Sequence, residues 1–163
     1  MRHIHHGKWL RYTPERLPEH APPLTMFARR ESDGVDWYEY INPHLEPLTS
    51  KLRDQPAKSN FAKDSVKFAA FMTDLPDGTQ RYVVGPAVHD ENRIWPAGHI
   101  VVEIPDYAGS DPQEELRNKV YDPDTETFTD QPPRAGGNFL QDLSDLMTRF
   151  ERLEKRLTEK GIL

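Results

Sequence analysis

The chain has 163 residues with a formal net charge of −6 and 36% hydrophobic residues. This hydrophobic share is below the roughly 45–50% (which also counts Gly) of an average globular domain. The length allows one ordinary domain or two very small ones. Because the 15 prolines oppose helices, we expect a loop-rich protein with a thin core. The sequence has no stripe of basic residues that would indicate nucleic acid as a ligand. The lack of Cys excludes disulfides and thiolate metal sites. No apolar run is long enough to cross a bilayer, so we expect a soluble protein without membrane insertion.

Residues 1–24 are predicted to form an extended, irregular, proline-rich arm. Four prolines lie between positions 14 and 23, more than a helix tolerates. His3, His5 and His6 crowd the start of the arm, and neighbouring imidazoles can bind Zn or Ni. No carboxylate or thiolate lies beside them in the sequence. We therefore expect a solvated arm, no metal site and no other cofactor.

Residues 25–130 are predicted to form a small antiparallel β domain. Residues 25–41 are predicted to form a hairpin that turns at Asp33-Gly34, with aromatic residues 37–41 as the return strand. For residues 42–65 we expect a loop with one helical turn near residues 49–54.

The segment 66–104 carries the clearest strand pattern. Residues 66–72 and 81–84 flank the turn 75–79, in which proline presets φ and glycine accepts a positive φ. Residues 87–88 and 93–95 are predicted to pair, and residues 99–104 to form another strand. Residues 120–128 are predicted to form strand, tight turn and strand. Turn signals every eight to twelve residues indicate a mainly β fold, a sandwich or barrel-like domain.

Residues 131–137 are predicted to be a linker, and residues 138–163 a coiled-coil helix that oligomerises. Asn138 suits its N-cap and Gly161 its end. Large apolar residues recur at alternating spacings of four and three, the heptad pattern by which helices wind around one another. This predicted oligomer interface consists of Phe139, Leu143, Leu146, Phe150, Leu153 and Leu157.

The stripe widens on one side at Leu140 and Met147, which favours a trimer of the chain over a dimer. An alternative is an amphipathic helix that packs on its own β domain. A helix this short is marginal alone, so it needs support from the β domain or from a longer partner.

No residues are predicted to be catalytic. Five acidic residues could supply the two carboxylates of a glycoside hydrolase, but their spacing singles out no pair. They are Asp90, Glu91, Glu103, Asp106 and Asp111. The alternation of Asp122, Asp124 and Glu126 is similar to calcium ligands, but the EF-hand glycine is absent and we expect a turn. The sequence has no nucleophile elbow, P-loop or dinucleotide-binding motif.

The three tryptophans allow two interpretations. Trp9, Trp37 and Trp95 could line a sugar-binding surface, because aromatic rings stack on apolar sugar faces. They could instead form the core of a protein that is poor in Leu and Ile, which is the more common arrangement.

Two hairpin motifs, Arg30–Tyr38 and Val120–Phe128, precede a linker and a short coiled coil. This combination resembles small tail and fibre-associated structural proteins of tailed bacteriophages. The resemblance implies a non-enzymatic virion protein, such as a tail-fibre, adaptor or tail-associated component, that is made in the host cytoplasm and contacts other virion proteins. Three alternatives remain open: a carbohydrate- or receptor-binding module facing a host surface glycan, a small glycan or peptide hydrolase, and an assembly chaperone.

Overall fold

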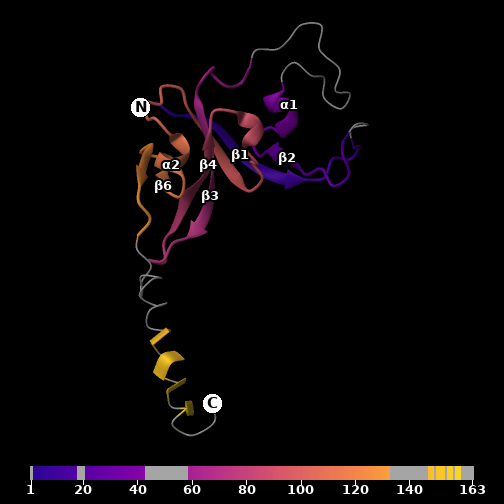
Figure 1. Ribbon diagram of the computed structural model, residues 1–163. Coiled ribbons are helices and arrows are strands. Elements are labelled where there is room, and N and C mark those ends of the chain that lie inside the picture. Colours follow the sequence, from indigo (N-terminus) through magenta and orange to yellow (C-terminus); the bar gives the residue numbers. More distant parts are fainter. Residues whose placement is uncertain are drawn as a thin grey trace. The chain divides into compact units, whose positions relative to one another are not determined.

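The computed structural model describes residues 2–17, 21–42 and 59–132, and nine residues between 147 and 158. The chain divides into two units, one of Met1–Asp74 with Gln80–Gln131 and one of Leu75–Thr79 with Pro132–Leu163. The first unit holds the β-sheet (Figure 1). The described residues between 147 and 158 are helical. In the described part of the chain, no helix has the length and apolar character needed to span a membrane.

The first unit is built on one antiparallel sheet of seven strands, so the predicted mainly β, antiparallel fold is confirmed. The strands are β1 (Ile4–Tyr12), β2 (Phe27–Arg30), β3 (Val66–Asp74), β4 (Gln80–Val88), β5 (His99–Ile104), β6 (Val120–Asp122) and β7 (Thr127–Thr129). Their order across the sheet is β2-β1-β5-β3-β4-β6-β7. Three short helices accompany them: α1 (Trp37–Ile41), the 3₁₀ helix η1 (Glu91–Arg93) and α2 (Pro112–Leu116). The described strands thus form one sheet with β2 and β7 at its edges, not the two layers of a sandwich.

The irregular arm predicted for residues 1–24 is wrong for residues 4–12, which form the interior strand β1 between β2 and β5. The prolines that suggested an arm begin only at Pro14, beyond the end of this strand. Trp9 is fully buried in the sheet. Burial of such a large ring stabilises the strand in a way that local composition does not reveal.

The second half of the hairpin predicted for residues 25–41 is also wrong, because residues 37–41 form α1 instead of a strand. Asp36 caps this helix, and its side chain accepts hydrogen bonds from the backbone N–H groups of Tyr38 and Glu39. The spacing of Trp37, Tyr40 and Ile41 puts their side chains on one helical face, and all three are buried. The cap and this apolar face outweigh the β propensity of aromatic residues.

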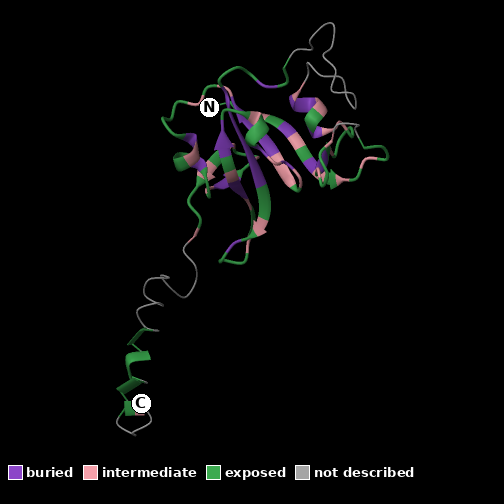
Figure 2. Ribbon diagram, turned by 45° about the vertical axis from the view of Figure 1, so that its right-hand side comes forward, coloured by how far each residue is buried: buried purple, intermediate pink, exposed green. Residues whose placement is uncertain are grey.

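The core consists of two clusters of buried apolar residues, and much of the buried chain lies in the strands of the sheet (Figure 2). Alternation along β3 and β5 divides the core, with Ala69 and Val101 on one face and Phe68, Ala70 and Val102 on the other. We call the first face the tryptophan face, since its core consists of Trp9, Ala28, Trp37, Tyr40, Ile41, Phe61, Ala69, Val88, Ile94 and Val101. The opposite face is the Phe68 face, with Val66, Phe68, Ala70, Val84, Ala87, Val102, Ile104, Leu116 and Tyr121 in its core.

The sheet is strongly curled around the Phe68 face. His3 lies just before β1, and its ring stacks on Tyr121 of β6 with 5.6 Å between the ring centroids. Its ring also lies 5.6 Å from that of Phe128 in β7. In a flat sheet β1 and β6 would be four strand spacings, roughly 19 Å, apart. The curl therefore brings the start of the chain against the far end of the sheet.

The hairpins predicted later in the sequence are confirmed. β3 and β4 pair around the turn 75–79, and β6 and β7 pair around a turn in which Asp122 accepts from the N–H groups of Asp124 and Thr125. The strand predicted for 99–104 is β5. The predicted pairing of 87–88 with 93–95 is wrong, because Asp90 caps η1 in between. The helical turn predicted near residues 49–54 lies outside the described residues, as do residues 133–137 of the predicted linker 131–137 and much of the predicted helix 138–163.

Candidate functional site

The most unusual chemistry of the sheet is a chain of polar side chains buried on the tryptophan face. His6 Nε2 lies 2.8 Å from Glu103 Oε2, and His6 Nδ1 lies 2.6 Å from the hydroxyl of Tyr40. The second carboxylate oxygen of Glu103 accepts a hydrogen bond from the backbone N–H of Ala62 at 2.6 Å. The His6 and Glu103 side chains are 5% and 1% exposed, so these hydrogen bonds form away from water.

A β-bulge at Gly7 orients His6 toward this chain. The pairing of β1 with β5 shifts by one residue between His5 and Lys8, and Gly7 has a φ of +87°. With regular alternation His6 and Trp9 would lie on opposite faces of the sheet. The extra residue places both of their rings against Tyr40 on the tryptophan face.

The hydrogen bonds suit a neutral imidazole with its proton on Nε2. The Tyr40 hydroxyl then donates to His6 Nδ1, and Nε2–H donates to the carboxylate of Glu103. Burial lowers the pKa of His6, and the Glu103 carboxylate only partly opposes this effect. Burial likewise raises the pKa of the Tyr40 hydroxyl, against the influence of the neighbouring Arg30.

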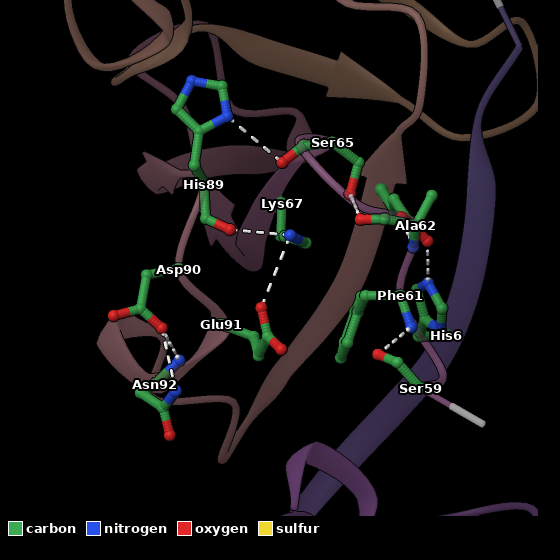
Figure 3. A network of polar contacts seen from close by, with 11 residues as sticks. His6, Ser59, Phe61, Ala62, Ser65, Lys67, His89, Asp90, Glu91 and Asn92 are labelled. Carbon is green, nitrogen blue, oxygen red and sulfur yellow. Dashed lines mark hydrogen bonds and ion pairs between the residues drawn. The ribbon is translucent and has the colours of Figure 1, made fainter. Parts of the chain in front are cut away.

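A buried lysine extends the polar row on the next strand. Lys67 of β3 is paired in register with Glu103 of β5, and its side chain is 4% exposed. Its Nζ donates to the carbonyl oxygen of His89 at 2.6 Å and lies 3.4 Å from Glu91 Oε2 (Figure 3). The ring of Phe61 lies 5.7 Å from the same ammonium group. The ammonium is thus partnered by a carbonyl, a carboxylate and a ring face, as a buried charge requires.

The order Tyr40–His6–Glu103 is similar to a nucleophile, base and carboxylate relay. A nucleophile must reach its substrate, yet Tyr40 is only 8% exposed and the two groups behind it are less exposed still. Its raised pKa also disfavours the phenolate. We interpret this row of hydrogen-bonded side chains as a polar staple that links β1, α1, β5 and the segment before β3.

The three N-terminal histidines do not converge on one point. The rings of His3 and His5 both stack on Tyr121, on the Phe68 face, whereas His6 lies on the tryptophan face. His3 Nδ1 lies 3.0 Å from the Tyr121 hydroxyl, and His5 Nε2 lies 3.6 Å from Glu126 Oε1. Within the described ranges, no group of three or more His, Cys, Asp or Glu side chains is arranged to hold a metal ion.

Four of the five acidic residues considered for hydrolysis have separate partners. Asp90 caps η1, Asp111 caps α2, and Glu91 faces Lys67. Glu103 is held by His6 and Ala62.

Two of the three tryptophans belong to the core. Trp9 and Trp37 are 0% and 1% exposed, and their rings meet edge to face with 4.9 Å between the centroids. Neither can stack on a sugar, and Trp95 is half-buried against the same cluster. The indole N–H of Trp9 is buried without a hydrogen-bond partner among the described residues.

Two residues of the predicted oligomer interface can be located. Phe150 lies in the helical part of the second unit and is 60% exposed, and Leu157 is helical and half-buried. Met147, beside the interface, is 59% exposed. Phe139, Leu143, Leu146 and the side chain of Leu153 lie outside the described residues.

The sequence interpretation missed the staple, although two signals for it were present. Lys67 and Glu103 interrupt apolar runs at positions where the strand is buried on both faces. A charged residue in such a run requires a buried partner. The partner His6 lies 97 positions from Glu103, so no local pattern connects them.

No family model matches this chain, and the searches of curated proteins and of solved structures found no significant match.

Proposed function

We propose that this protein is a non-enzymatic structural component of a virion, such as a tail-fibre, adaptor or tail-associated protein, that self-associates through residues 138–163. Its partners are further copies of the chain and other virion proteins. The virion assignment is supported by the sequence resemblance of the Val120–Phe128 hairpin and of the C-terminal heptad pattern to phage tail proteins, whereas the motif Arg30–Tyr38 leads into α1 and lends no hairpin to it. Copies held on one helical bundle attach multivalently, which raises avidity without tighter individual sites.

The observation that carries the self-association is the exposed apolar side chain of Phe150 on a helical segment. A phenyl ring that is 60% exposed gains from burial against a partner helix. Phe150 is one of the six residues that recur at heptad spacing, and a heptad stripe fits a second helix with the same stripe. The occupant that we propose is therefore the same segment of other copies, with a trimer favoured over a dimer.

Sedimentation equilibrium of the full chain tests the proposal. The double variant Leu146→Asp with Leu153→Asp places two charges in the stripe, and we expect it to convert an oligomer into a monomer. The matched control, Thr148→Asp with Lys155→Asp, has the same seven-residue spacing on the opposite side of the helix and should leave the oligomer intact. A wild-type monomer at high concentration, or equal dissociation of both variants, would contradict self-association through the stripe.

Two further measurements test the assembly-chaperone and hydrolase alternatives. Identification of the protein by mass spectrometry in purified particles would support a structural component, whereas its absence from finished particles would favour an assembly chaperone. Turnover of peptidoglycan or polysaccharide by the purified chain would favour the hydrolase and contradict the non-enzymatic assignment.

A further inference from the structure

The strand order separates the sheet into two parts that meet where β1 pairs with β5. β2 and β1 lie at one end of the sheet, and β1 is joined to the remaining strands by its pairing with β5. The helix α1 follows β2 in the chain and packs beside it (Figure 1). We call β1, β2, α1 and the residue His3 before β1 the N-terminal block. The line between β1 and β5 is the seam.

Each of the three histidines in the N-terminal block contacts a group on the other side of the seam. His3 reaches the Tyr121 hydroxyl at 3.0 Å, His5 faces Glu126 at 3.6 Å, and His6 binds Glu103 at 2.8 Å. His3 and His6 are buried, with 6% and 5% of their surfaces exposed.

The two described histidines outside the block have hydrogen-bond partners on their own side of the seam. His89 Nδ1 lies 3.3 Å from the carbonyl oxygen of Ser65, and His99 Nδ1 lies 2.7 Å from that of Ala97. Neither of these two hydrogen bonds crosses the seam, so the buried histidines of the block have a distinct position.

We propose that the seam is an acid-sensitive joint: protonation of His3 and His6 loosens the N-terminal block from β5, while the β3–β4 hairpin stays paired. This inference goes beyond the proposed function and does not depend on it. It rests on the burial of two histidines and on their contacts across one line of the sheet.

The groups around His6 decide the direction of the effect. Glu103 of β5 favours its protonation, whereas burial, Arg30 of β2 and His5 of β1 oppose it, and burial is the largest influence. On α1, the Tyr40 hydroxyl donates to Nδ1 of the neutral ring, and a proton on Nδ1 would remove that acceptor. Lys67 of β3 is paired in register with Glu103, but its ammonium group lies against the carbonyl oxygen of His89 and the carboxylate of Glu91.

His3 responds in the same direction. Burial lowers its pKa, the carboxylate of Glu126 opposes this, and His5 and the α-amino group add smaller repulsive contributions. On β6, its ring nitrogen meets the Tyr121 hydroxyl. Protonation has the opposite effect on the contact between His5 and Glu126, because a charged imidazole would form an ion pair with the carboxylate. Its side chains are 40% and 35% exposed, so water screens most of that gain.

The sign of the pH dependence follows from these lowered pKa values. The pKa of each histidine is below the ordinary 6.5 while the ring is buried at the seam. The ring therefore binds a proton more readily in the opened state, in which it is exposed to water. The contribution to the seam is complete well above pH 6.5 and is lost as the pH falls through 6.5 toward the folded-state value. Each unit of lowering at a released histidine shifts the opening equilibrium by about tenfold.

Hydrogen exchange of the full chain at pH 8 and pH 5.5, expressed as protection factors, measures the opening directly. We expect protection in β1 and in the β5 amides bonded to β1 to fall on the order of tenfold or more at pH 5.5. Protection between β3 and β4 should change much less. An equal loss in both places, or no loss at the seam, would overturn the proposal.

The double variant His3→Phe with His6→Gln removes both titrating rings while keeping a ring at the first position and a polar group at the second. We expect its seam protection to be nearly independent of pH between 8 and 5.5, and the control His89→Gln to respond as the wild type does. An unchanged pH response in the double variant would refute the assignment. If the double variant does not fold, an NMR titration of the His3 and His6 imidazoles in the wild-type protein tests the proposal instead. Folded-state pKa values at or above 6.5 for both rings would exclude the mechanism.

Discussion

Replacement of Gly7 by Ala tests the bulge that orients the buried staple. Gly7 has a φ of +87°, a conformation that L residues rarely adopt. A Cβ at this position would lie 3.1 Å from Cδ of Arg30, which is closer than ordinary van der Waals contact, and 3.4 Å from its Cγ. The substitution therefore introduces both backbone strain and a steric contact.

A second glycine separates these two effects. Gly34 has a φ of +75°, and no atom lies within 4 Å of a Cβ built there. For each Ala variant we expect a backbone cost of about 1–2 kcal/mol, partly offset by the lower entropy of its unfolded chain. The contact with Arg30 adds roughly 1 kcal/mol at Gly7, at the low end for overpacking because a long side chain can bend. Expected losses of stability are thus about 2 kcal/mol for Gly7→Ala and about 1 kcal/mol for Gly34→Ala.

Guanidinium denaturation followed by tryptophan fluorescence gives both losses, because Trp9 lies two residues from the bulge and is fully buried. A double-mutant cycle with Arg30→Ala, which removes Cγ and Cδ, should show a coupling of roughly 1 kcal/mol with Gly7→Ala. It should show none with Gly98→Ala, where φ is +79° and the added Cβ also meets nothing. Equal losses for Gly7→Ala and Gly34→Ala, without coupling to Arg30, would refute the steric part of this reasoning.

Five further substitutions test the staple, a helix cap and the core, each by denaturant unfolding at pH 8. Glu103→Ala leaves a buried imidazole and a backbone N–H without their acceptor and should cost about 3–5 kcal/mol, whereas Glu103→Gln should cost less because its amide oxygen still accepts. Asp36→Ala removes the N-cap of α1, which accepts a backbone hydrogen bond at 2.8 Å, and should cost about 1–2 kcal/mol. Phe68→Ala, at a fully buried position, should cost about 3–5 kcal/mol, against about 1 kcal/mol for Phe71→Ala at 37% exposure. Similar losses for the two phenylalanine variants would contradict the assignment of the core.

Interaction with close sequence neighbours explains why some elements could be predicted. The turn between β3 and β4 is built within five residues, where Leu75 N–H donates to the Thr79 carbonyl oxygen at 2.8 Å and Asp77 accepts from Thr79. The β6–β7 turn depends in the same way on Asp122 and the two N–H groups that follow. Such turns depend on local geometry, so their residue pattern alone predicts them.

Two predictions were wrong where distant contacts outweigh local propensity. β1 belongs to the sheet because Trp9 and His6 find partners in α1, β5 and the segment before β3. Residues 37–41 have the aromatic composition of a strand but form a helix. A helix places residues three and four positions apart on one side, and this buries Trp37, Tyr40 and Ile41 against the tryptophan face. Neither outcome can be read from neighbouring residues.

The sequence by itself determined the antiparallel, mainly β character of the protein, through short apolar runs separated by turns whose chemistry is local. Only the tertiary structure decided which strand lies inside the sheet and which buried charges meet. His6 and Glu103 are 97 positions apart, and they pair because a bulge at Gly7 and the register of β1 with β5 place both on one face. The physical reason is that a buried polar group needs a hydrogen-bond partner, and that partner can come from any part of the chain that lies nearby in space. Which groups are buried is decided only when the sheet forms.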